Sequence, residues 1–269
     1  MPARAAVEAL LRGRKLDRTL TTSLPERPAE EAVAALDTDA LDRALSGGLA
    51  RGHVSEVVGP ASSGRTSIAW AALAAATKRG ESVALIDTFD RFDPPTAHAC
   101  GLDLSRLLWV RGQALSKTTG AIDPAWLPGV RAVSGPGTLL ERVIDRAIKA
   151  LNLVVQSRVC TLVVIDLVDV PATALRRLPA STWFRIERAI EGSDTAVLIL
   201  AAQPVARSAG GRSIQLGDHH VAWNGGHERT RRVAGVRARA SVAAARWSHT
   251  AQVDLQTAVI NGVSSVPEQ

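Results

Sequence analysis

The feature that most constrains the fold is a glycine-rich loop at residues 59–66, which reads GPASSGRT. Residues 53–58 before it alternate and end in β-branched side chains, as a β-strand does. Residues 64–79 are rich in alanine and end in Lys-Arg before Gly80, which is typical of a helix. Strand, glycine loop and helix in this order predict a phosphate-binding loop in an α/β protein.

The loop has the spacing G-x-x-x-x-G-K-[ST], except that Arg65 stands where the motif has lysine. Backbone N–H groups of such a loop, together with the helix dipole, form a cradle for an anion. A guanidinium is longer and planar, and it does not simply replace a compact ammonium at a phosphate. Thr66 keeps a hydroxyl that is able to hold Mg²⁺. The loop residues expected to bind phosphate or nucleotide are Gly59, Ser62, Ser63, Gly64, Arg65 and Thr66.

Two apolar runs later in the chain would complete a nucleotide site. Residues 160–166 end in Asp166, the form of a strand whose carboxylate acts on Mg²⁺ through water. Residues 196–203 end in Gln203, whose amide could sense a terminal phosphate. A metal is therefore expected only if nucleotide binds, through Thr66 and Asp166. The alternatives are structural: a tight turn that packs a helix on a sheet, and a buried strand that happens to end in aspartate.

These pieces, in this order, resemble RecA. The resemblance includes the approach to the loop at 45–52, the segment 86–94 after the second strand, and residues 101–108. It spans residues 41–250 and is strongest from 45 to 110. It implies a RecA-like P-loop NTPase fold, in which helices flank a mostly parallel sheet with antiparallel strands at its C-terminal end. Residues 1–40 would then be a helical arm and linker, 41–250 the core, and 251–269 the last strand and a tail.

One departure from the RecA pattern concerns hydrolysis. That pattern has a glutamate two residues beyond the Ile-Asp-x of the second strand, where it activates the attacking water; here the position is Phe89. A phenyl ring accepts no proton, and loss of a positioned base costs about 10²–10⁴ in rate. Arg65 in place of lysine also weakens stabilisation of the transferring phosphoryl group. We therefore predict no catalytic residue, a vestigial nucleotide site and no required cofactor, with ATP or ADP and Mg²⁺ bound weakly at most.

A small RecA-like chain with a degraded ATP site and a short basic tail is similar to the ImuA family, accessory factors of bacterial damage-induced mutagenesis. Membership implies a non-catalytic adaptor in translesion synthesis. Its direct partner would be an ImuB-like inactive Y-family polymerase. Through that partner it would reach an error-prone replicative-type polymerase. DNA and RecA are further candidate partners. Two alternatives stay open: a slow DNA-dependent ATPase or recombinase paralogue that uses Arg65 as a substitute cation, and a SulA-like inhibitor of cell division.

The charge balance suits an anionic partner. The chain has 32 lysine and arginine residues against 26 acidic residues, a formal charge of +6. This charge is consistent with DNA binding, and equally with a soluble protein whose surface is rich in arginine. The segments 169–180 and 205–212 stand where RecA keeps its DNA loops. The second has no aromatic residue for base stacking, so we expect only weak, salt-sensitive contact. The DNA-binding candidates are Arg176, Arg177, Arg207 and Arg212.

The remaining expectations concern compartment and secondary structure. The chain has two cysteines, a charged N-terminus without a signal-peptide core, and no run of about 20 apolar residues, so we expect a cytoplasmic protein with no membrane partner. A basic, hairpin-like connection is expected at 225–232. Further helices are predicted at 2–16, 29–36, 95–100, 137–157 and 181–191, strands at 82–87, 106–110, 213–223, 232–247 and 250–260, and a long loop at 112–136.

Overall fold

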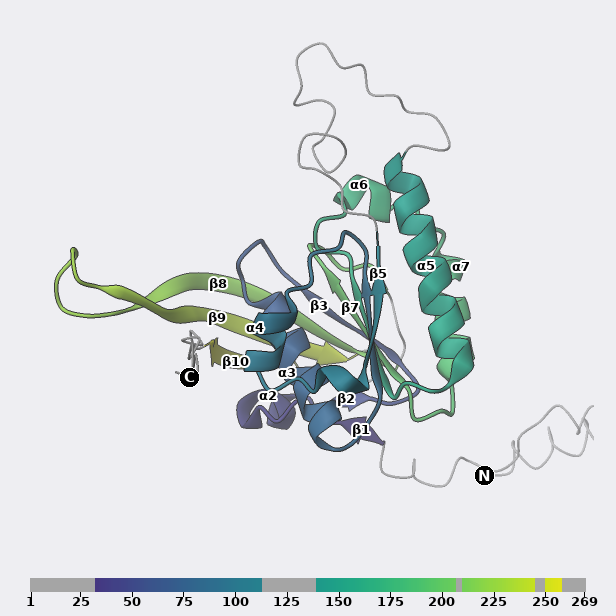
Figure 1. Cartoon of the computed structure of the whole chain (residues 1–269), viewed down its shortest axis with the longest axis horizontal. Helices are drawn as coiled ribbons and strands as arrows, with labels where there is room; N and C mark the ends of the chain where they lie inside the picture. Colours follow the sequence, from purple (N-terminus) through teal and green to yellow (C-terminus); the bar gives the residue numbers. More distant parts are fainter. Residues whose placement is uncertain (1–31, 113–138, 207–209, 245–249, 258–269) are drawn as a thin grey trace, which may run out of the picture. The chain divides into compact units, whose positions relative to one another are not determined.

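A single large sheet organises the protein. In this computed structural model, which describes residues 32–112, 139–206, 210–244 and 250–257, the sheet has eight strands in the order β10-β9-β8-β3-β7-β6-β4-β5 (Figure 1). The described residues from Val33 onward belong to one compact unit. The strands are β3 (Val54–Val58), β4 (Val83–Asp87), β5 (Leu107–Arg111), β6 (Leu162–Asp166), β7 (Ala196–Ala201), β8 (Arg212–Asn224), β9 (Arg232–Ala244) and β10 (Ala251–Gln256).

The middle of the sheet is parallel and its C-terminal part is antiparallel. Neighbours from β8 through β3, β7, β6 and β4 to β5 run in the same direction. β9 runs antiparallel to both β8 and β10. The inner strands are buried along almost their whole length, as expected where helices cover both faces of a parallel sheet. The predicted fold class, a RecA-like α/β fold with antiparallel strands at the C-terminal end, is confirmed.

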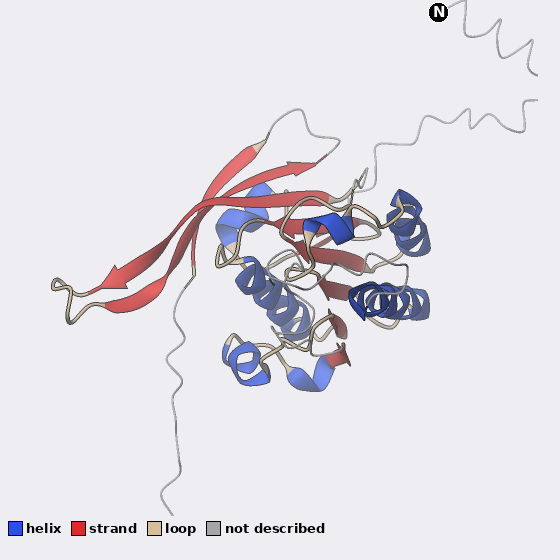
Figure 2. Cartoon of the chain, turned by 90° about the horizontal axis from the view of Figure 1, so that it is seen from above, coloured by secondary structure: helices blue, strands red, loops and turns tan. Residues whose placement is uncertain are grey.

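Two layers of helices cover the two faces of the sheet (Figure 2). One face carries α3 (Arg65–Lys78) and α4 (Pro94–Ala99), and the other carries α5 (Leu139–Ser157) and α7 (Ala180–Ile190). Strand alternation divides the side chains between them: Leu85 packs on the α3 side, and Ile86 on the α5 side.

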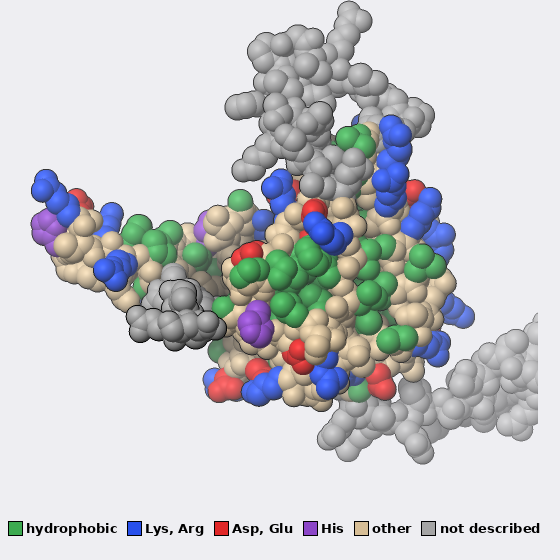
Figure 3. Space-filling model, viewed as in Figure 1, with side chains coloured by type: hydrophobic (Ala, Val, Ile, Leu, Met, Phe, Trp, Pro, Cys, Tyr) green, Lys and Arg blue, Asp and Glu red, His purple; other side chains and the backbone are tan. Residues whose placement is uncertain are grey.

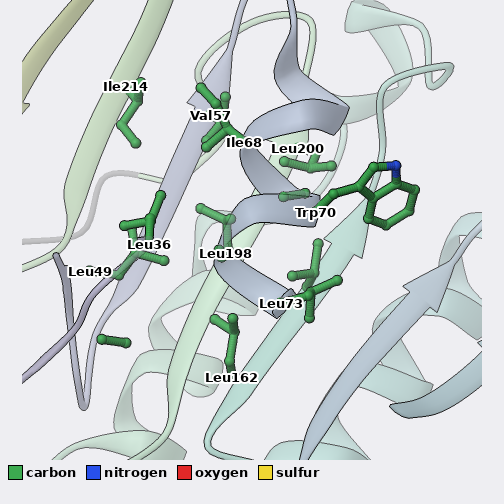
Figure 4. Packing of buried hydrophobic residues seen from close by; sticks show 14 of the residues in the cluster. Leu36, Leu49, Val57, Ile68, Trp70, Leu73, Leu162, Leu198, Leu200 and Ile214 are labelled. Carbon is green, nitrogen blue, oxygen red and sulfur yellow. The ribbon is translucent and has the colours of Figure 1, made fainter. Parts of the chain in front are cut away.

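The α3 side of the core is drawn in Figure 4. There Trp70 and Leu73 of α3 lie against Leu198 and Leu200 of β7 and Leu162 of β6. Trp70 also meets the ring of Phe92 edge-on, with 5.2 Å between the ring centroids. Because α3 begins at the glycine loop, this packing fixes the direction in which the loop faces.

Short elements complete the described structure. They are β1 (Val33–Ala34), β2 (Leu49–Ala50), α2 (Asp39–Ala44), α6 (Ala172–Leu175) and a single 3₁₀ turn at Leu104–Arg106. β1 and β2 pair antiparallel, so the helical turn predicted at 29–36 is wrong where it overlaps Val33–Ala34. The physical reason is packing: Ala34 and Leu36 are buried in the α3-side core.

Most predicted elements agree with the structure to within one to three residues. The helical turn predicted at 29–36 is the exception among the described residues. The helix predicted at 2–16 and nearly all of the loop predicted at 112–136 lie outside the described residues. The division of the chain at residues 40 and 250 stays a prediction. No helix among the described residues is both long and apolar enough to cross a membrane.

Candidate nucleotide site

The glycine loop joins the end of β3 to the start of α3, as predicted. Gly64 is the residue before the first turn of α3 and has φ of +97°, which a side chain would strain. Gly59 is required for a different reason, close approach. A Cβ added there would lie 2.8 Å from Ser63 Oγ and 2.9 Å from the carbonyl oxygen of Leu216. Both glycines of the motif are therefore demanded by the backbone.

Two buried polar atoms at the loop have no hydrogen-bond partner among the described residues: Ser63 Oγ and Arg65 Nη1. The side chains are almost inaccessible, since Ser63 is 2% and Arg65 8% exposed. Buried donors without acceptors are costly and rare, so each calls for an explanation. An anion held by the loop would supply the missing acceptors. The residues present therefore fit a phosphate group.

Carboxylates gather at the ends of the neighbouring strands. Asp166 ends β6 and Asp87 ends β4, and the two are register partners in the parallel pair. Alternation from Leu85 and Val164 places both aspartates on the α3 side, the side of the loop. Asp166 therefore stands at the end of β6 on the same side of the sheet as the loop, and its role toward Mg²⁺ stays a prediction.

The electrostatics of Asp166 and Arg65 are coupled. Burial raises the pKa of Asp166 to about 6, and Asp87 and Asp169 add to the increase. The Val168 N–H, 2.9 Å from Asp166 Oδ1, and the charge of Arg65 act in the opposite direction. Burial also lowers the pKa of Arg65, against the attraction of Asp166 and Asp169. Arg65 is therefore a buried cation that faces the acidic end of the sheet.

The carboxylates that follow β4 are already engaged. Asp87, 2% exposed, accepts hydrogen bonds from the backbone N–H groups of Arg91 (2.8 Å) and Phe92 (2.9 Å) and from Trp109 Nε1 (3.2 Å). Asp90 binds Arg111 through two hydrogen bonds of 2.9 and 2.8 Å. The hydrogen bonds from Arg111 lower the pKa of Asp90. Asp87 and Asp90 are therefore both occupied by protein donors and are not placed as a free general base.

Asp93 has a structural task of its own. It precedes α4, and its carboxylate accepts a hydrogen bond from the backbone N–H of Thr96 (3.2 Å), as a helix N-cap does. The Thr96 hydroxyl donates to the same oxygen. Asp87 and Asp93 therefore hold the backbone of the segment between β4 and α4, and Asp90 links it to the side chain of Arg111.

Phe89 is 4% exposed and packs with the side chains on the α5 side of the sheet. That is the face opposite α3. The position at which the RecA pattern has its glutamate is therefore apolar here, and its side chain is part of the core. A charged side chain could enter this position only with loss of packing and an uncompensated buried charge.

Gln203 follows β7 and is exposed. It lines a cavity of about 280 Å³ together with Trp183 and Phe184 of α7. The segment beyond it is held by Glu56 of β3, whose Oε2 accepts hydrogen bonds from the N–H groups of Val205 (3.0 Å) and Ala206 (3.1 Å). No hydrogen bond found among the described residues joins Gln203 to the glycine loop, so its role in sensing a terminal phosphate stays a prediction.

The arginines expected to contact DNA have different environments. Arg176 and Arg177 are exposed at the end of α6, and Arg177 Nη1 lies 3.4 Å from Glu141. Arg207 lies outside the described residues. The prediction that Arg212 contacts DNA does not fit its position. Arg212 begins β8, is 4% exposed, and donates from Nη1 to the carbonyl of Gly210 (3.2 Å). A buried guanidinium in a strand cannot contact a DNA backbone.

Residues at the C-terminal end of the sheet line one side of a cavity beside the loop, which the sequence did not predict. A cavity of about 310 Å³ lies beside the loop, with Ser63, Gly64 and Trp70 on one side and Leu255 and Thr257 on the other. Thr257 Cγ2 is 3.7 Å from where a Cβ on Gly64 would stand. Only tertiary folding brings these segments together, since almost two hundred residues separate them along the chain. Among the described residues, no group of three or more His, Cys, Asp or Glu could hold a metal ion.

Comparison with known proteins agrees with this geometry. Residues 22–119 match the sequence model of a family described as RecA N-terminal domain. The fold is RecA-like. The RecA protein of Chlorobaculum tepidum is 50% identical over 70 residues, 26% of this chain and 20% of that protein. The RecA protein of Salinispora tropica is 47% identical over 87 residues, 32% and 25% of the two chains.

The match to RecA is partial in length. RecA of Lactobacillus delbrueckii subsp. bulgaricus is 37% identical over 111 residues, 39% of this chain and 33% of that protein. The chain thus matches between a fifth and a third of the length of these RecA proteins. The resemblance to RecA is confirmed for that stretch, which contains the glycine loop, Phe89 and Asp93.

The close approach at Gly59 gives a matched test of the loop. Gly59→Ala places a Cβ against Ser63 and Leu216, so the loop must shift; we expect a loss of about 1–3 kcal/mol in the free energy of unfolding. Gly226→Ala meets open space and serves as the control. Urea unfolding of both variants measures the difference. Equal stability of the two would contradict the geometry of the loop.

The raised pKa of Asp166 predicts a pH dependence. The carboxyl group ionises near its ordinary value of 3.8 in the unfolded chain, but only near 6 in the folded chain. Between these values the folded state binds more protons, so the contribution of Asp166 to the free energy of unfolding falls as pH rises. Asp166→Asn should therefore gain stability relative to the wild type from pH 3.8 to about 6. Parallel curves for the two proteins, measured by urea unfolding across that window, would contradict the assignment.

Proposed function

We propose that this chain is a non-catalytic RecA-fold accessory protein, an adaptor in DNA-damage-induced translesion synthesis. The observation that carries the proposal is Phe89, which packs into the α5-side core at the position where the RecA pattern places the water-activating glutamate. A fold that keeps its frame without this base has lost the group that makes water a nucleophile. Its remaining use is to bind and to hold partners.

The neighbouring side chains support the loss of hydrolysis. A general base needs free hydrogen-bonding capacity and a place within reach of the water. Asp87 is committed to three N–H donors, and Asp90 to Arg111. Arg65 adds a second defect, because a forked guanidinium differs from the ammonium that P-loop enzymes place on the transferring phosphate. Two separate parts of one mechanism are therefore altered.

Phosphate binding is a different matter from hydrolysis, and the loop retains what it needs. Ser63 Oγ, Arg65 Nη1 and the N–H groups at the start of α3 are the donors that would hold a nucleotide's phosphates. Thr66 and Asp166 would hold Mg²⁺, which when bound would neutralise phosphate charge. These residues would hold a nucleotide without splitting it.

The partners follow from the resemblance to the ImuA family. We propose an ImuB-like inactive Y-family polymerase as the direct partner, and an error-prone replicative-type polymerase as the one reached through it, in the cytoplasm. DNA contact is assigned to Arg176 and Arg177, which are exposed. RecA itself is a further candidate partner.

Hydrolysis is the first test. Purified protein with ATP, Mg²⁺ and single-stranded DNA should release no more phosphate than Asp166→Ala does under the same conditions. Arg65→Lys should not restore turnover, because the missing base is independent of the lysine position. DNA-stimulated turnover that Asp166→Ala abolishes would instead establish the slow-ATPase alternative.

Partnership is the second test. Co-expression with the ImuB-like protein should yield a stable complex on affinity purification, and that complex should survive Gly59→Ala if nucleotide is dispensable for docking. Removal of residues 1–31 asks whether the N-terminal segment is needed, and it leaves β1 and Leu36 intact. Failure of the full-length protein to co-purify would contradict the adaptor role.

A further inference from the structure

The hairpin of β8 and β9 projects beyond the rest of the sheet (Figures 1 and 2). β8 pairs with β3 only from Ser213 to Gln215, and β9 pairs with β10 only from Arg237 to Val242. The distal half of the hairpin therefore extends past its neighbours. Along Asp218–Asn224 the outer edge of β8 has no partner strand among the described residues. An unpaired edge of this kind is a template for an added strand.

One face of the distal hairpin is apolar. The side chains of Val221, Trp223 and Val233 are 43%, 47% and 46% exposed. Val221 and Trp223 are two residues apart on β8 and so share a face, and Val233 is the cross-strand partner of Trp223. We call these three residues the hairpin ledge. Clustered exposed apolar side chains of this kind mark interaction sites.

The end of the hairpin is basic. Between Gly225 and Arg232 the chain has three arginines and one glutamate, and the arginines are exposed. Arg231 lies over the indole of Trp223, with its Cζ 4.6 Å from the ring centroid. Figure 3 shows apolar side chains along the hairpin and basic side chains at its tip. No salt bridge found among the described residues involves Arg229, Arg231 or Arg232.

We propose that the hairpin ledge docks an extended, acidic segment of another protein, which adds as a strand to the free edge of β8. The backbone of the segment would pair with His220–Asn224, beyond the irregularity at Asp218, whose φ is +42°. Alternate apolar side chains would then cover Val221 and Trp223, and its carboxylates would meet the arginines at the tip. This proposal is independent of the nucleotide site, because it uses none of the residues of the loop.

The same observations disfavour the other occupants. A second copy of the chain would bring its own basic tip against this one, and like charges oppose such a contact. Single-stranded nucleic acid would match the arginines and could stack on Trp223. Val221 and Val233, however, offer it neither charge nor hydrogen bonds, and the arginine already covers one side of the indole. Aromatic and arginine side chains around an apolar centre are typical of protein interfaces.

The test uses the full chain and a labelled synthetic peptide in which aspartate alternates with valine and phenylalanine. Fluorescence anisotropy should show binding that falls about tenfold or more in Trp223→Ala and in Arg231→Glu. Leu153→Ala, which removes a 70% exposed side chain from α5, should bind the peptide as the wild type does. Hydrogen exchange should show new protection of backbone amides within His220–Asn224 when the peptide is added, which a contact with the face alone would not produce.

The contrary outcomes are distinct. Peptide binding that is absent, or that Trp223→Ala and Leu153→Ala affect equally, would overturn the proposal. So would an oligothymidylate of the same net charge that binds more tightly than the peptide and loses affinity in Trp223→Ala. A concentration-dependent dimer that Trp223→Ala dissociates would assign the ledge to a second copy. Circular dichroism and thermal unfolding control for folding, and Trp223→Phe should retain binding because it keeps an aromatic side chain there.

Discussion

The structure depends on the parallel register of its central strands. That register aligns the end of β3, where the glycine loop begins, with the ends of β6 and β4, where Asp166 and Asp87 stand. A shift of one residue in either strand would turn its aspartate to the α5 side, away from the loop. Continuous burial of the strands makes such a shift costly, because it would exchange Leu85 with Ile86 and Val164 with Ile165 between two differently shaped cores. Packing of the whole sheet therefore fixes the geometry of a site at one of its ends.

Within that frame, the chemistry of the site has changed more than its shape. The glycines still make the turn and still permit the close approach to Leu216. Arg65 is buried near the acidic ends of the strands, and Phe89 packs in the core on the other side of the sheet. The function that we propose separates two properties that occur together in P-loop enzymes, the ability to hold a phosphate and the ability to activate water. The docking role that we propose needs only the first, if it needs the site at all.

The sequence predicted the elements that repeat a pattern over many residues or that need a particular residue type. The glycine loop, the buried strand that ends in Asp166 and the amphipathic helix α5 are examples, because periodicity and glycine chemistry are local. Arg212 shows the limit: it follows a segment that the sequence predicts as a loop, and only its pairing with Ala244 of β9 and its burial show that it begins a buried strand. The wall formed by Leu255 and Thr257, and the strand at Val33–Ala34, likewise depend on contacts with distant parts of the chain. The sequence around these residues contains no pattern from which such contacts could be predicted.

The most direct measurement of the central claim is the crystal structure of the protein after prolonged incubation with ATP and Mg²⁺. We expect either no nucleotide or an intact triphosphate, held by Ser63 and Arg65, with no carboxylate in position to activate a water beside the terminal phosphate. ADP in the loop, or a lytic water held by Asp87, Asp90 or Asp166 in line with that phosphate, would contradict it.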